Sequence, residues 1–385
     1  MLRVISQTQT LGLENPPSSI AAWGRWGALI LAISGAIHLL WFSGAEIGHF
    51  FPRFEPHGSS WSQRVHMWTR WDGGHYLRIA REGYNNGEPN NQSVAFFPLY
   101  PMLMAGVSDL LDVEDYQSGL LISHFFHLVT LWLVFWLARI RFHWELKPIL
   151  LSLGAFALYP AHNFGFSIYT ESLFLSLSLG AFIAYEYKYF LLAGILAALA
   201  SGTRSQGVLV GAALWLDFAW QHRSTLPTDL KSITKLLRLS IFPLGLFLYS
   251  TYLHFEFGDF LIFSKTQALW GRHLTTPIHT ILQDGANVDV YLILVGSVYL
   301  TYTMWQTPHH HPLRDRLYTT LSLALPLCSG SMQSFSRLVW VLFPLYIVGV
   351  MKFQTHSKIK KSYVVLGLFF SLIYAFKVGQ KAGVT

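Results

Sequence analysis

The chain has 385 residues, of which 52% are hydrophobic and 16% aromatic but only 12% charged. An ordinary soluble domain carries about twice this charged share, so the composition excludes one and indicates an all-α polytopic membrane protein. The formal net charge of +7 does not indicate nucleic-acid binding, because the basic residues stand mostly in short loops between apolar segments.

The first quarter of the chain contains one apolar segment and one long polar segment. Residues 1–22 are polar and are predicted to form a cytoplasmic tail, and residues 23–43 are long enough to cross a bilayer. Residues 44–95 carry too many charges for the hydrocarbon layer, so they are predicted to form a large external loop. Within residues 61–68, apolar side chains recur at helical spacing, which predicts an amphipathic helix on the membrane surface.

Asp72 is the residue of this loop that most needs an explanation. As an N-cap, it would begin a short helix over residues 73–82 that ends at Gly83. As a catalytic base, it would take a proton from a hydroxyl group, and a helix N-terminus would keep the carboxylate ionised for this purpose. The two interpretations are compatible, and the sequence leaves both open.

Four neighbours of Asp72 are predicted to bind substrate. His75 lies one helical turn after Asp72, and Trp71 and Tyr76 offer flat rings on which a sugar stacks, although such rings are equally expected at a membrane interface. Arg70 completes this set.

Further apolar segments follow along the rest of the chain. Residues 94–111 are interrupted by two prolines and predict a short or re-entrant helix. Clear spans are predicted at residues 119–138, 148–168, 171–187, 239–257, 289–306, 317–329, 336–352 and 361–377. With two short apolar pieces between residues 189 and 220, the chain is predicted to make roughly ten or eleven crossings within a single domain, residues 1–385.

Glu171 is a second unusual carboxylate. The short basic loop at residues 139–147 is predicted to be cytoplasmic, so the next turn, residues 167–172, would face outward on the side of Asp72. An ionisable residue at membrane depth is a functional candidate, and a structural ion pair is the alternative. Glu171 is therefore a candidate substrate-binding residue.

Arg204 is the leading candidate for binding an anion. It stands in the polar turn at residues 201–207, between two apolar pieces that are each too short to span a bilayer untilted. Non-helical backbone at this depth is tolerated where it lines a wet cavity, and guanidinium binds phosphate bidentately. A snorkelling or ion-paired arginine is the alternative. Weaker phosphate-binding candidates are Arg337 and, in a second external loop at residues 258–288, Lys265 and Arg272.

Several motifs occur together in this order along the chain: Arg70-Trp71-Asp72-Gly73-Gly74-His75-Tyr76, residues 79–84, residues 96–101, Thr203-Arg204-Ser205 and residues 337–344. Together they resemble the PIG-V family of glycosylphosphatidylinositol mannosyltransferases, especially its prokaryotic relatives. The resemblance implies an integral-membrane glycosyltransferase of the GT-C class, which places a catalytic Asp in the first external loop and uses lipid-phosphate sugars. That Asp maps onto Asp72.

The resemblance implies a particular reaction. A hexose, mannose by analogy, would pass with inversion from a polyprenyl- or dolichyl-phosphate donor to a hydroxyl group of a lipid or glycan acceptor, with Asp72 as base. No metal and no cofactor is predicted, because arginines would neutralise the leaving phosphate. The prokaryotic motifs favour a bacterial inner membrane with the active site on the external face. The alternatives are a polytopic transporter or lipid flippase, and a non-catalytic partner of another membrane glycosyltransferase.

Overall fold

The computed structural model describes residues 20–49, 66–84, 89–143, 145–226, 228–283 and 287–380. These residues form α-helices and short 3-10 helices, and no strand occurs among them, which confirms the all-α prediction. Residues 1–19 of the predicted tail and residues 61–65 of the predicted surface helix lie outside the described ranges.

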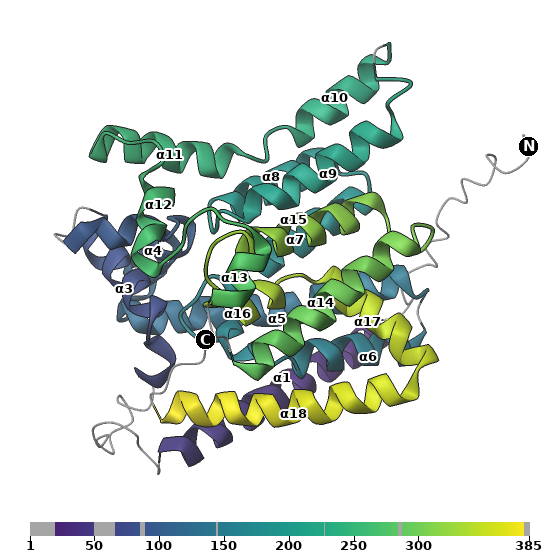
Figure 1. Ribbon diagram of the computed structural model, residues 1–385, viewed down its shortest axis with the longest axis horizontal. Helices are drawn as coiled ribbons and strands as arrows, with labels where there is room; N and C mark the ends of the chain where they lie inside the picture. Colours follow the sequence, from purple (N-terminus) through teal and green to yellow (C-terminus); the bar gives the residue numbers. More distant parts are fainter. Residues whose placement is uncertain are drawn as a thin grey trace, which may run out of the picture.

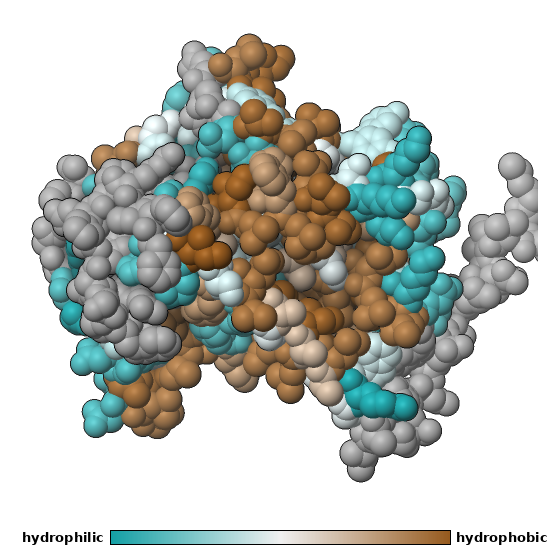
Figure 2. Space-filling view, turned by 90° about the horizontal axis from the view of Figure 1, so that it is seen from below, coloured by the Kyte–Doolittle hydropathy of each residue, from teal (hydrophilic) through white to brown (hydrophobic). Residues whose placement is uncertain are grey.

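Four helices of the described chain are long and apolar enough to cross a membrane: α1 (Ile20–His49), α5 (Asp115–Arg141), α14 (Val288–Gln306) and α18 (Ser357–Gly379). A fifth span results if α10 (Leu230–Leu239) and α11 (Leu244–Phe257), which meet at 49°, are counted together. α18 lies beside α1 (Figure 1). Apolar side chains cover the middle of the face seen from below, between hydrophilic residues at the two ends (Figure 2). This pattern is that of a polytopic membrane protein.

The remaining helices are shorter, and several of the ten or eleven predicted crossings correspond to them. These shorter helices include α6 (Leu146–Ala157), α7 (Glu171–Glu186), α8 (Phe190–Ser201), α9 (Gly207–Gln221), α15 (Leu313–Leu327) and α17 (Pro344–Thr355). One end carries α3 (Asp72–Glu82), α4 (Leu99–Leu111) and α12 (Ile262–Lys265), whereas α13 (Pro277–Gln283) and α16 (Phe335–Trp340) lie nearer the middle (Figure 1). The 3-10 helices are η1 (His66–Thr69), η2 (Pro89–Ala95), η3 (His162–Gly165) and η4 (Thr266–Trp270).

The buried centre of this bundle is α7. Nearly all of its side chains are buried, including those of Leu173, Phe174 and Phe182. It packs against α5, α8 and α9. A helix that is apolar all round is buried on all sides, so α7 holds its first residue, Glu171, at a fixed place in the interior.

Two predicted spans are broken helices. α6 ends at Ala157, and residues 159–170, which include Pro160, are buried in the protein and contain only the short η3. Likewise, the predicted span at residues 336–352 stops at Trp340 and starts again at Pro344. In both places the apolar composition reflects burial inside the protein, which hydropathy alone does not distinguish from contact with lipid.

The first predicted external loop begins within a helix. α1 continues to His49, so residues 44–49 of the predicted loop are helical. The described end of the predicted surface helix is η1, where Trp68 is buried and packs on Phe42 and Phe166, with ring centroids 4.7 and 5.2 Å apart. This tryptophan therefore ties the loop to the bundle.

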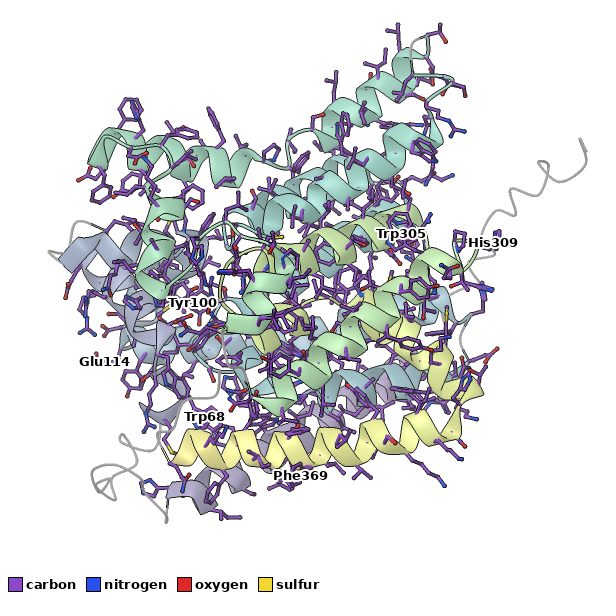
Figure 3. All side chains as sticks on the ribbon, in the orientation of Figure 1. Trp68, Tyr100, Glu114, Trp305, His309 and Phe369 are labelled. Carbon is purple, nitrogen blue, oxygen red and sulfur yellow. The ribbon has the colours of Figure 1, made fainter. Side chains whose placement is uncertain are left out.

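A buried charged network closes the other end of the bundle. Arg314 Nη1 lies 3.0 Å from Asp217 Oδ2, and its Nη2 contacts Glu186. Arg141 Nη2 lies 2.9 Å from Glu186 Oε1 and 3.1 Å from Asp315 Oδ2. These residues stand where α5, α7 and α9 finish and α15 starts. The 16 residues of α7 separate this network from Glu171 by about 24 Å. Glu114 and His309 mark the two opposite ends in Figure 3.

Candidate active-site cavity

A cavity of about 440 Å³ lies at the end of the bundle opposite the charged network. Its volume is within the range of small-molecule sites. The first turns of α3 and α7 reach this cavity, together with the turn that precedes α9, the segment before α13 and part of α16. The charged and amide side chains in its wall are Asp72, Glu171, Arg204, Gln206, Gln267, Arg272, Gln333 and Arg337.

Asp72 belongs to the helix that it was predicted to cap. α3 begins at Asp72 itself, Trp71 occupies the N-cap position, and no side chain caps this helix, so the predicted capping role is wrong. The Asp72 carboxylate instead accepts a hydrogen bond from Arg337, with 2.5 Å between Oδ2 and Nη1. Gly83 ends α3 with φ 73°, as predicted.

The turn before Asp72 is held by a tyrosine that the sequence analysis did not identify. Trp71 has φ 54° and ψ −122°, an uncommon conformation for a bulky residue. The Tyr169 hydroxyl accepts a hydrogen bond from the Asp72 N–H at 3.2 Å and donates one to the Arg70 carbonyl oxygen at 3.3 Å. The Tyr169 ring also lies 5.1 Å from the Arg337 guanidinium carbon. Tyr169 therefore positions both members of the Asp72–Arg337 pair.

Glu171 extends this pair into a chain of four charges. Glu171 Oε1 lies 2.5 Å from Arg204 Nη1 and 3.3 Å from Arg337 Nε. Positive and negative groups thus alternate from Asp72 through Arg337 and Glu171 to Arg204. The ion-pair alternative considered for Glu171 and Arg204 describes their contact, and both side chains also line the cavity.

Arg272 differs from the other two arginines of the cavity. It donates hydrogen bonds to Gln267 Oε1 at 3.1 Å and to the Gln333 carbonyl oxygen at 3.4 Å, both neutral acceptors. No ion pair within the described ranges includes it. Burial, followed by the charge of Arg337, lowers the pKa of Arg272 to about 10, so it stays cationic at neutral pH. Among the described residues, Arg272 is therefore a cavity arginine without a carboxylate in ion-pair contact.

The local charges keep Asp72 ionised. Burial alone would raise the pKa of this carboxyl, but the charge and hydrogen bond of Arg337 outweigh it, with further help from His75 and Arg272. The pKa of Asp72 therefore lies below its usual value. Its place at the start of α3 acts in the same direction, because a helix N-terminus stabilises negative charge.

The remaining predicted site residues are distributed differently. Tyr76 lines the cavity, whereas Arg70 donates to the Val378 carbonyl oxygen at 3.2 Å, away from Asp72. His75 stacks on Phe96 with ring centroids 4.4 Å apart, and the Trp71 side chain is exposed. Lys265 does not line the cavity. Its exposed ammonium group pairs with Asp259 at 2.6 Å.

Gln206 is a cavity residue that was not singled out from the sequence. It immediately precedes α9, lines the cavity and is 2% exposed. The sequence analysis identified the polar turn at residues 201–207, but it singled out only Arg204, because Arg204 is the charged residue of that turn. In the part of the chain described, no group of three or more His, Cys, Asp or Glu side chains is arranged to hold a metal ion.

Comparisons with known proteins place the chain in a family. The chain matches the family model described as "Mannosyltransferase (PIG-V)" over residues 57–270. It is similar to a curated protein of Rattus norvegicus named "GPI alpha-1,6-mannosyltransferase 2", with 31% identity over 228 residues, which cover 54% of this chain and 45% of the rat protein. The chain thus spans about half the length of this relative. Asp72, Glu171 and Arg204 fall inside the family match, and Arg272 and Arg337 follow it.

Proposed function

Because the chain belongs to the PIG-V mannosyltransferase family, we propose that it is a membrane glycosyltransferase that uses this cavity as its active site. The donor is a polyprenyl- or dolichyl-phosphate hexose, with mannose the first choice, and the acceptor is a hydroxyl group of a lipid or lipid-linked molecule. The observation that supports the proposal best is an ionised carboxylate, Asp72, in a cavity that three arginines line.

Asp72 acts as the general base. It takes the proton from the acceptor hydroxyl as the hydroxyl oxygen attacks the anomeric carbon from the face opposite the phosphate. The bond between the anomeric carbon and the phosphate oxygen breaks, its electron pair leaves with the phosphate, and the product has the inverted configuration. Arg337 and Tyr169 hold the carboxylate in place for this step.

The donor phosphate binds near Arg272. Arg204 and Arg337 are each paired with a carboxylate, whereas the acceptors of Arg272 within the described ranges are neutral, so its guanidinium is the best available partner for an anion. Arg204, the leading candidate from the sequence, then acts mainly through Glu171. The first turns of α3, α7 and α9 also favour the negative charge that develops on the leaving phosphate.

The proposed orientation follows from the two ends of the bundle. The basic loop at residues 139–147 contains Arg141, which belongs to the charged network, and the cavity lies at the opposite end. If basic loops stay in the cytoplasm, the cavity faces outward. We place the protein in a bacterial inner membrane with its active site on the external face.

The experiment that tests this function is sugar transfer by the purified protein in liposomes. The liposomes contain extracted host lipids as acceptors and a panel of polyprenyl-phosphate sugars as donors. Asp72→Asn keeps the size of the side chain and removes the base, so we expect consumption of one donor by the wild type and a fall in kcat of at least about 100-fold in the variant. The matched control is Asp112→Asn, an exposed residue in a left-handed conformation that asparagine adopts readily.

Each outcome is decisive for the proposal. Loss of activity in folded Asp72→Asn with retention in Asp112→Asn supports the catalytic assignment, and the product identifies the acceptor. Equal transfer by all three proteins would place the base elsewhere, with Glu171 next to be tested. No consumption of any donor by the wild type would favour a transporter or a non-catalytic partner.

A further inference from the structure

The amide group of Gln206 is buried in the cavity wall, and no described residue forms a hydrogen bond with it. Its side chain is 2% exposed, and neither its nitrogen nor its oxygen has a partner among the residues that the structure describes. Leaving a buried amide unpaired is unfavourable, because the group loses its bonds to water on folding. A side chain of this kind in a cavity wall is therefore expected to bond to what fills the cavity.

The chemistry of an amide restricts the ligand group that satisfies it. The nitrogen donates two hydrogen bonds and the oxygen accepts up to two. A phosphate would satisfy only the donor, since its oxygens repel the amide oxygen. Two adjacent sugar hydroxyl groups satisfy both atoms, because each hydroxyl group donates and accepts.

A second buried group with an open acceptor lines the same cavity. Glu171 is 1% exposed, and its Oε1 is taken up by Arg204 and Arg337, but Oε2 has no hydrogen-bond partner among the described residues. A carboxylate oxygen of this kind accepts a hydrogen bond from a hydroxyl group, and bonds to a charged partner are stronger than bonds between neutral groups. Arg204 connects the two residues. Its guanidinium holds Glu171 in place, and it precedes Gln206 by two positions in the same turn.

We propose that Gln206 and Glu171 Oε2 form the subsite for the transferred sugar, and that the Gln206 amide selects the sugar by binding two of its adjacent hydroxyl groups. This inference rests on the proposed function and adds to it the residues that recognise the sugar. The cavity is then divided by chemistry: neutral and acceptor groups next to the starts of α7 and α9 take the sugar, and Arg272 takes the phosphate.

The experiment measures coupling between the Gln206 side chain and individual hydroxyl groups of the donor. Wild type and Gln206→Leu are given the polyprenyl-phosphate hexose that the wild type consumes, and then the analogues that each lack one sugar hydroxyl. We expect the wild type to lose roughly 10- to 100-fold in kcat/KM with two analogues, which lack neighbouring hydroxyl groups. Gln206→Leu loses a similar factor with the complete donor and nothing further with those two analogues.

Gln221→Leu is the matched control, because it also removes an amide side chain, at the opposite end of α9. Gln221 lies at the other end of α9, where its exposed side chain donates to Asp217 Oδ2 at 2.7 Å. Gln221→Leu therefore keeps the wild-type ranking of all analogues. The inference is overturned if every analogue loses the same factor in wild type and Gln206→Leu, because Gln206 would then act only through the fold.

A second variant and the wild type itself cover the case in which leucine prevents folding. Gln206→Met retains an unbranched side chain of similar length and is expected to show the same coupling. If the wild type tolerates removal of every sugar hydroxyl, the subsite does not exist as described. Failure of the wild type to consume the complete donor contradicts the proposed function instead, so the two failures are distinguishable.

Discussion

The contact between Asp72 and Arg337 has two opposing effects on a catalytic base: it keeps the carboxylate ionised, and it lowers the affinity of the carboxylate for a proton. A base must be ionised to accept a proton, and Arg337 keeps Asp72 ionised by lowering the pKa against the effect of burial. The same interaction makes the carboxylate a weaker base, because a lower pKa means a lower affinity for the proton. Because Arg337 sets the pKa of Asp72, substitution of Arg337 is expected to change the pH dependence of the reaction.

Arg337→Met is expected to move the acidic limb of the pH profile to higher pH. In the wild type the pKa of Asp72 lies below its usual value of about 3.9, so kcat/KM falls only at strongly acidic pH. Without Arg337, burial dominates and raises that pKa. Profiles of kcat/KM in liposomes between pH 4 and 8 measure the shift. Arg81→Met, which removes an exposed partner of Asp115, is the control, and an unmoved limb in Arg337→Met would contradict the assignment of Asp72.

The Asp72–Arg337 pair is also expected to make the stability of the fold depend on pH, because proton binding and folding are thermodynamically linked. A carboxyl group whose pKa is depressed in the folded protein stabilises the fold above its unfolded pKa. This contribution is lost as the pH falls through the depressed value. The stability that Asp72 adds is thus complete at neutral pH and disappears only in strong acid.

Single residues were predictable where their chemistry conflicts with an apolar chain. Asp72, Glu171 and Arg204 are charged residues that stand next to apolar segments, and the structure places all three in one cavity. Lys265 and Arg272 looked equivalent because both are basic residues of the same loop, and only their spatial partners separate them. The roles of Tyr169 and Gln206 depend on contacts made or missing in space, which leave no signal in composition.

At the scale of elements, the site depends on close backbone packing around the turn between α8 and α9. A Cβ atom added at Gly207 would collide with the backbone of Ala200 and Ser201. One added at Gly245, in α11, would collide with the backbone of Ala198 and Gly202. Small residues at helix contacts in membranes allow this approach, and here they fix the turn that carries Arg204 and Gln206.

Gly207→Ala is expected to destabilise the protein by about 1–3 kcal/mol, because the methyl group overpacks the turn. An alanine in an open helix position would instead add about 0.5–1 kcal/mol of stability. Gly296→Ala in α14 is the matched control, since nothing lies within 4 Å of a Cβ atom there. Thermal unfolding in detergent measures both variants. Equal rises in Tm would contradict the packing described for Gly207.

Helices were predictable from hydropathy where the chain runs straight through an apolar layer, as in α5, α14 and α18. Hydropathy misplaced the boundaries where apolar residues face other protein segments, as at residues 159–170 and around the break between α16 and α17. Those breaks matter for the site. The first brings Tyr169 to the turn before Asp72, and the second lies just beyond Arg337.

At the scale of the molecule, the bundle has two charged ends with different tasks. At one end, the charges of the cavity leave polar atoms available to a ligand. At the other end, Arg314 is buried and bonded to two carboxylates, Asp217 and Glu186. Removing one partner from a buried network leaves a charge uncompensated, so this end is expected to contribute to stability without taking part in the reaction.

Arg314→Met is therefore expected to destabilise the protein by about 3–5 kcal/mol while kcat per folded molecule stays close to the wild-type value. Arg223→Met is the control at the same end, because Arg223 is exposed, stacks on Trp220 and donates to its carbonyl oxygen at 2.8 Å. Thermal unfolding gives the stability, and transfer assays below the unfolding transition give kcat. A large fall in kcat of folded Arg314→Met would show that the two ends are coupled.

Asp72 and Arg337 are 265 residues apart in the sequence, so the ribosome synthesises Asp72 well before its partner. Ribosomes add about 5–20 residues per second, so roughly 13–53 s pass between the synthesis of Asp72 and that of Arg337. During this interval Asp72 lacks the guanidinium that keeps its carboxylate ionised. Completion of the Asp72–Arg337 pair is thus a late event in synthesis, and a chain arrested before α16 would contain the carboxylate without its arginine.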